Sequence, residues 1–102
     1  MKIINTNEIF KEIEDLFSKE KFKEIIELLS EEDMSAIAEK DAIAELYIWR
    51  GNARYEQKDY DNAIIDYNKA IEINQNYTLA YFNSAFVYSF LPIKARKNIQ
   101  KQ

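Results

Sequence analysis

Residues 44–77 read AELYIWRGNARYEQKDYDNAIIDYNKAIEINQNY, and this stretch indicates how the chain folds. Apolar side chains recur three and four residues apart on both sides of a polar break at residues 58–59. This spacing predicts two helices, over 41–58 and 59–73, with Asp41 and Asp59 as their N-caps. The expected apolar faces comprise Ile43, Leu46, Tyr47, Trp49, Ala53 and Tyr55 in the first helix, and Tyr60, Ala63, Ile64, Tyr67, Ala70 and Ile71 in the second.

The segment before this stretch has the same kind of pattern. Asn5 and Glu8 are spaced as in a capping box, which predicts a helix that ends near Ser18. A second helix is expected from Phe22 to Leu29, ended by the polar residues that follow it. Residues 34–43 are compatible with either a short turn or an extra helical turn.

The segment after this stretch predicts one more helix, from about Thr78 to Leu91. Pro92 interrupts the pattern, because its ring excludes the helical conformation of the preceding residue. Residues 92–102 are weakly apolar and are expected to form a C-terminal tail or capping segment.

An internal repeat relates these segments. Residues 47–51 align with residues 81–85 at a separation of 34 residues, a period typical of stacked helix pairs. Phe22 also mirrors Tyr60, at a separation of 38 residues. The first helix pair is therefore interpreted as a divergent copy with an insertion of about one helical turn.

Residues 44–77 resemble a tetratricopeptide repeat. The residue types that carry the resemblance stand in one register, at Tyr47, Gly51, Tyr60, Ala63, Tyr67 and Ala70. Small residues at Gly51 and Ala63 are expected to let two antiparallel helices approach closely, while the tyrosines fill the space between them. The family's usual leucine, aromatic, turn glycine and closing proline are replaced by Arg50, Arg54, Lys58 and Gln75, and none of these changes breaks the helical pattern.

The resemblance implies an all-α fold, a right-handed stack of antiparallel helix pairs with about 2.5 repeats. A single domain over 1–102 is expected. Its parts are a divergent helix pair at 5–31, a complete repeat at 44–77, the first helix of a further repeat at 78–91, and the tail at 92–102.

Composition supports a helical fold and argues against catalysis. The chain has 102 residues, 47% of them hydrophobic, and only one glycine and one proline, whereas sheet-rich domains need frequent turn residues. It has no cysteine and no histidine, which removes thiolate nucleophiles, the usual acid–base group and the commonest metal ligand. No enzyme activity, metal or cofactor is expected, and Asp59, Asp61 and Asp66 are interpreted as solvated surface carboxylates.

Charge and hydropathy bear on partners and location. The net charge is −4, but residues 78–102 carry four bases and no acid. This short basic end is interpreted as a solvated tail, so no nucleic-acid partner is expected. Because no signal peptide or membrane span is recognisable, a cytoplasmic protein without a membrane partner is expected.

The resemblance also implies where a partner binds, because the first helix of each repeat lines the concave face. A protein or peptide partner is therefore expected in an apolar groove, which makes the chain an adaptor. The predicted groove residues are Ile48, Asn52, Tyr55, Leu79, Phe82, Asn83 and Phe86.

Two alternatives stay open for the aromatic residues of the last helix. Phe82, Phe86 and Phe90 either form an ordinary core under the C-terminal segment or mediate homodimerisation. Some family members clamp acidic C-termini with lysine, arginine and asparagine. Asn52 and Asn83 occupy the asparagine positions here, but Ile48 stands where the lysine is needed, so an acidic-tail clamp is not expected. The two asparagines remain suited to bonding the backbone of an extended peptide.

Overall fold

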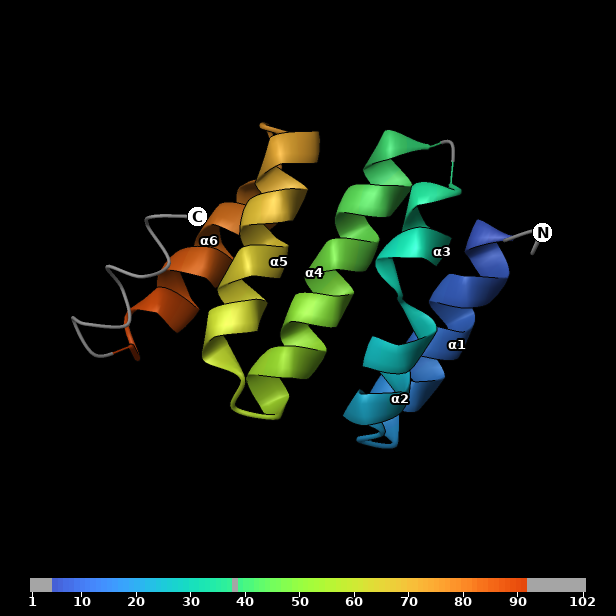
Figure 1. Cartoon of the computed structure of the whole chain (residues 1–102), viewed down its shortest axis with the longest axis horizontal. Coiled ribbons are helices and arrows are strands. Elements are labelled where there is room, and N and C mark those ends of the chain that lie inside the picture. Colours follow the sequence, from blue (N-terminus) through green and yellow to red (C-terminus); the bar gives the residue numbers. More distant parts are fainter. Residues whose placement is uncertain (1–4, 38, 92–102) are drawn as a thin grey trace.

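Helices follow one another along the part of the chain that the computed structural model describes, residues 5–37 and 39–91. They are α1 (Thr6–Ser18), α2 (Phe22–Leu28), α3 (Glu31–Ser35), α4 (Lys40–Glu56), α5 (Tyr60–Ile73) and α6 (Thr78–Tyr88). Figure 1 shows α4 and α5 side by side in the middle, with α1 and α2 toward the N-terminal end and α6 toward the other. No strand occurs in these residues, so the predicted all-helical stack is confirmed.

The start of α1 agrees with the predicted N-cap at Asn5. The Asn5 side chain accepts hydrogen bonds from the backbone N–H groups of Asn7 at 3.0 Å and Glu8 at 3.3 Å. These bonds satisfy amides that have no partner inside the helix. The first helix therefore begins where the sequence predicted.

The connection between α2 and α4 contains a short helix that the sequence predicted only in part. The polar residues after Leu29 were expected to end a helix, and an extra turn was considered only over 34–43. Instead, Ser30 caps α3, since its Oγ accepts from the N–H of Asp33 at 3.1 Å. Met34 on this helix is buried. The extra helical turn thus exists but begins earlier, because Ser30 is a good N-cap and Met34 finds a place in the core.

Two other helices, α4 and α6, have boundaries that differ from the prediction. Helix α4 is capped at Glu39, and Asp41 lies in its first turn, where it accepts a hydrogen bond from the Asn74 side chain at 3.2 Å. Asp59 precedes α5 as predicted, but its side chain makes no cap bond. Helix α6 ends at Tyr88, before Leu91, and Pro92 lies outside the described residues.

Helices α1 and α4 end in the same way, which supports the repeat relation. Glu20 has φ 58° and Lys58 has φ 65°, both in the left-handed region. Around Lys58, the N–H of Asp59 bonds to the carbonyl of Arg54 and the N–H of Lys58 to that of Tyr55, each at 2.9 Å. This is a Schellman motif, and an equivalent pair of bonds surrounds Glu20. Glu20 and Lys58 are 38 residues apart, the separation already seen between the two helix pairs.

Lys58→Gly is expected to stabilise the protein. A left-handed conformation costs a non-glycine residue about 1–2 kcal/mol, and the extra freedom of glycine in the unfolded chain offsets part of this gain. The free energy of unfolding should therefore rise by about 0.5–1 kcal/mol, measured by urea denaturation. Gln57→Gly is the control, since Gln57 has φ −85° and should lose stability on the same change. A lower urea midpoint for Lys58→Gly would contradict the assigned backbone conformation.

The pair α4 and α5 packs closely at Gly51. A Cβ placed on Gly51 would lie 2.7 Å from Cε1 of Tyr67 and 3.2 Å from the backbone oxygen of Ala63. Tyr67 is 1% exposed and Ala63 fully buried, so neither has free space beside it. The expected interlocking of a small residue on one helix with a large one on the next is present.

Candidate functional site

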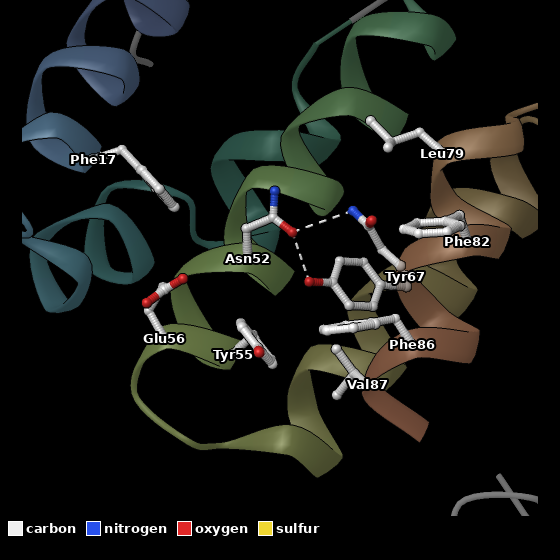
Figure 2. A pocket seen from close by; sticks show the side chains of 10 residues that line it. Phe17, Asn52, Tyr55, Glu56, Tyr67, Leu79, Phe82, Phe86 and Val87 are labelled. Atoms are coloured by element: carbon white, nitrogen blue, oxygen red, sulfur yellow. Dashed lines mark hydrogen bonds between the residues drawn. The ribbon is translucent and has the colours of Figure 1, made fainter. Parts of the chain in front are cut away.

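A pocket of about 410 Å³ opens between α4 and α6. Figure 2 shows its lining side chains, which are mostly aromatic or aliphatic. They are Phe17 of α1, Asn52, Tyr55 and Glu56 of α4, Tyr67 of α5, and Leu79, Phe82, Asn83, Phe86 and Val87 of α6. The size and apolar character suit a small group of side chains from a binding partner.

The polar part of the pocket is built around Asn52. The Tyr67 hydroxyl donates to Asn52 Oδ1 at 2.6 Å, and Asn83 Nδ2 donates to the same oxygen at 3.4 Å (Figure 2). Burial raises the pKa of Tyr67, so its hydroxyl stays protonated and keeps this donor role. Asn52 Nδ2 and Asn83 Oδ1 make no hydrogen bond within the described residues. One amide donor group and one amide acceptor therefore remain available to a ligand.

The apolar wall comes from α6 and is open to solvent. Phe82 is 66% exposed, Leu79 49% and Phe86 47%. The rings of Phe82 and Phe86 are nearly parallel, 6.4 Å apart between centroids, and Tyr55 lies 6.1 Å from Phe86. Large apolar side chains this exposed on adjoining turns form a patch of the kind used in protein contacts.

The structure brings six of the seven predicted groove residues to this pocket and leaves out Ile48. Ile48 is 3% exposed and belongs to the hydrophobic core. Its burial corrects its predicted place in the groove. Helix α4 packs against helices on several sides, so a residue one turn before Asn52 is already covered.

Four lining residues were not predicted as groove residues: Phe17, Glu56, Tyr67 and Val87. Glu56 lies one turn after Asn52, and helical periodicity alone would have found it. Phe17 comes from another helix pair, where it makes an edge contact with Trp49 at 5.4 Å. No sequence signal placed that residue beside α4.

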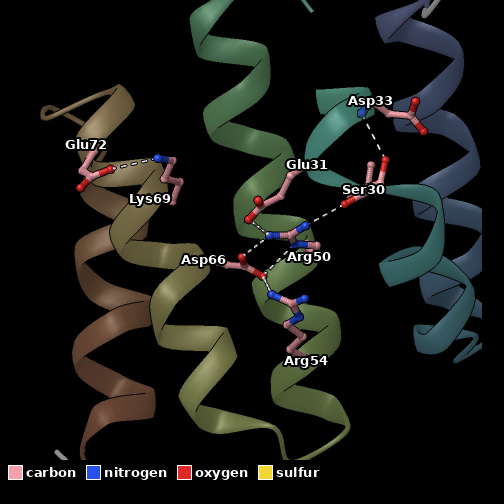
Figure 3. A network of polar contacts seen from close by, with 9 residues as sticks. Ser30, Glu31, Asp33, Arg50, Arg54, Asp66, Lys69 and Glu72 are labelled. Carbon is pink, nitrogen blue, oxygen red and sulfur yellow. Dashed lines mark hydrogen bonds and ion pairs between the residues drawn. The ribbon is translucent and has the colours of Figure 1, made fainter. Parts of the chain in front are cut away.

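A buried ion cluster, also not predicted, lies where α4 meets α5. Arg50 donates from Nε to Asp66 Oδ2 at 3.1 Å and from its second terminal nitrogen to Oδ1 at 2.7 Å, while Arg54 donates to Oδ2 at 2.9 Å (Figure 3). Asp66 is 1% exposed. The interpretation of Asp66 as a solvated carboxylate was therefore wrong.

Arg50 also connects the divergent first helix pair to the complete repeat. Its guanidinium donates to the backbone carbonyl of Leu29 at 2.9 Å and pairs with Glu31 at 3.4 Å. Burial raises the pKa of Asp66, and the hydrogen bonds and charges of Arg50 and Arg54 act against that rise. The bidentate geometry with two cations keeps this carboxylate in its charged form. The cluster thus holds three segments in one arrangement.

Two other kinds of site do not occur among the described residues. No group of three or more acidic, histidine or cysteine side chains in these ranges is placed to hold a metal ion. None of the helices described is long and apolar enough to cross a membrane.

Comparison with known proteins agrees with the repeat seen in the structure. Residues 51–89, which run from the middle of α4 to the end of α6, match the family model of the tetratricopeptide repeat. This match bears out the predicted resemblance of the region to a tetratricopeptide repeat. Tetratricopeptide repeats generally mediate protein–protein interactions and are typically non-catalytic. The matched residues include nearly all of the pocket lining, with Phe17 as the exception.

A curated relative is the Stress-induced-phosphoprotein 1 of Caenorhabditis elegans. It is 44% identical over 54 residues, which is 53% of this chain. The chain spans 14% of the length of that protein, so the likeness concerns the repeat region. No solved structure matches the chain significantly.

Proposed function

We propose that this tetratricopeptide-repeat chain binds a segment of another protein in the pocket between α4 and α6, without catalysing a reaction. The observation that carries the proposal is the exposed apolar wall formed by Leu79, Phe82 and Phe86 beside a polar floor at Asn52 and Asn83. Apolar surface of this extent favours contact with a partner, because complete burial of an exposed side chain of this size gains about 1.5–3 kcal/mol and these three remain about half exposed.

The free amide groups support an extended peptide as the bound form. Asn52 Nδ2 can donate a hydrogen bond to a peptide carbonyl, and Asn83 Oδ1 can accept one from a peptide N–H. Asn52 Oδ1 accepts hydrogen bonds from Tyr67 and Asn83. These bonds hold the two amide groups in place before a ligand arrives. A preorganised polar pair costs less ordering on binding than two mobile side chains.

Phe86→Ser is expected to weaken binding at least about tenfold, because it removes a half-exposed ring from the centre of the wall. The test is to select peptides on this protein from a random phage-displayed library and to measure their affinities by fluorescence polarisation. Tyr81→Ser is the matched control, since Tyr81 lies on the same helix, is 49% exposed and does not line the pocket. Equal losses for the two variants would place the binding surface elsewhere.

Self-association through α6 is a second candidate, favoured by the aromatic row that continues past the pocket. Phe90 is 53% exposed, does not line the pocket, and makes a T-shaped contact with Phe86 at 5.0 Å. Sedimentation velocity over a wide range of protein concentration tests this candidate. A mass that doubles with concentration, and that Phe90→Ser returns to the monomer value, would favour a structural dimer over a peptide groove.

A further inference from the structure

The charged side chains of α4 divide between two faces of the helix. Arg50 and Arg54 are both engaged by the buried Asp66, at 2.7 and 2.9 Å, and neither lines the pocket. Glu56 does line the pocket and is exposed. Among the residues that the structure describes, no lysine or arginine lines the pocket. Arg50 and Arg54 therefore stabilise the fold, and the charge that the described lining residues present to a ligand is a carboxylate.

A second carboxylate continues this negative face along α4. Glu45 lies two turns before Asn52 on the same side of the helix, because residues seven apart return to nearly the same direction. Burial raises the pKa of Glu45, and the charge of Glu14 on α1 raises it further. Within the described residues, no ion pair is formed by Glu14, Glu45 or Glu56. A carboxylate whose pKa is raised by burial and by a neighbouring negative charge is stabilised when a cation comes near.

The aromatic wall of the pocket also favours a cationic ligand group. Helix α6 carries no charged residue, so nothing on it repels a cation. The faces of Phe82, Phe86 and Tyr55 are centres of negative potential, which attract a lysine or arginine head group. The long aliphatic stem of such a side chain also packs on rings of this kind.

On the basis of the proposed function, we propose that the segment bound in this pocket carries a lysine or arginine next to apolar side chains, with its cation between Glu56 and the aromatic wall. The apolar neighbours fill the space beside Leu79 and Phe82. An acidic segment is disfavoured, since its charge meets Glu56 and finds no free cation among the lining residues that the structure describes.

The test uses three sets of fluorescein-labelled octapeptides. Each peptide places two leucines and one variable residue, in every order, on a serine and alanine background. The variable residue is lysine in the first set, glutamine in the second and glutamate in the third. Affinities are measured by fluorescence polarisation in about 0.15 M salt, where contacts longer than about 8 Å are largely screened.

In the unmodified protein, the tightest lysine peptide should bind about fivefold more tightly than its glutamine counterpart, and the glutamate peptide more weakly than both. Glu56→Gln should bring the lysine and glutamine peptides to within about twofold of each other. Glu72→Gln is the control for net charge, because Glu72 is an exposed carboxylate of α5 outside the pocket. It should leave the preference unchanged.

The outcomes separate this inference from the proposed function. If Phe86→Ser weakens all three sets but lysine, glutamine and glutamate peptides bind alike, the groove stands and the charge preference is overturned. If Glu72→Gln removes the lysine preference as effectively as Glu56→Gln, the attraction comes from net charge and the inference is wrong. If no peptide binds the folded protein at millimolar concentration, the proposed function itself fails.

Discussion

Asp66→Ala is expected to lower the free energy of unfolding by about 3–5 kcal/mol, because it leaves the buried Arg50 guanidinium without its counterion. Arg50 is 4% exposed and donates two hydrogen bonds to Asp66, so its charge cannot be hydrated in place. A loss of this size is a large share of the stability of a small domain. Urea denaturation followed by circular dichroism measures it.

Glu72→Ala is the matched control, since Glu72 is also on α5 and also pairs with a cation. Its contact with Lys69 is 3.4 Å long and exposed to solvent, so its removal should cost less than about 0.5 kcal/mol. If Asp66→Ala does not fold, Asp66→Asn provides a milder variant that keeps the shape and removes the charge. Equal losses for the Asp66 and Glu72 variants would show that the buried cluster contributes nothing beyond an exposed pair.

Gly51→Leu is expected to cost at least about 3 kcal/mol, because the new side chain must enter the space of the Tyr67 ring. Even a Cβ would lie 2.7 and 2.9 Å from two ring carbons of Tyr67. The ring cannot move freely, since it is buried and its hydroxyl is bonded to Asn52. We expect the thermal midpoint to fall by more than about 10 °C in calorimetry.

Gly51→Ala is the milder variant, with an expected loss of about 1 kcal/mol, because the gain in helix propensity offsets part of the clash. The internal repeat supplies the control at Ala85, which aligns with Gly51 but is exposed on α6. Ala85→Leu should change the midpoint little. An unchanged melting curve for Gly51→Leu would contradict the close approach of α4 and α5.

Much of the candidate site followed from the resemblance, which implied that the first helix of each repeat lines the concave face. Helical spacing agrees with this, because residues three or four apart share one face, as Asn52 does with Tyr55 and Phe82 with Phe86. Which helix faces are buried by neighbouring helices could not be predicted from the sequence pattern. Ile48 lies on the central helix α4 and is buried by its neighbours, whereas Leu79 on the outer helix α6 remains exposed.

Local propensity and spacing along the chain were enough to predict the helical class, the 34-residue repeat, the small residue at Gly51 and the aromatic character of α6. The packing of the helices in three dimensions was needed to show that Asp66 is a buried counterion and that the charge left facing the pocket is that of Glu56. Exposure and ion pairing depend on which helices meet. That is set by contacts between segments distant in sequence, which the pattern within one helix does not record.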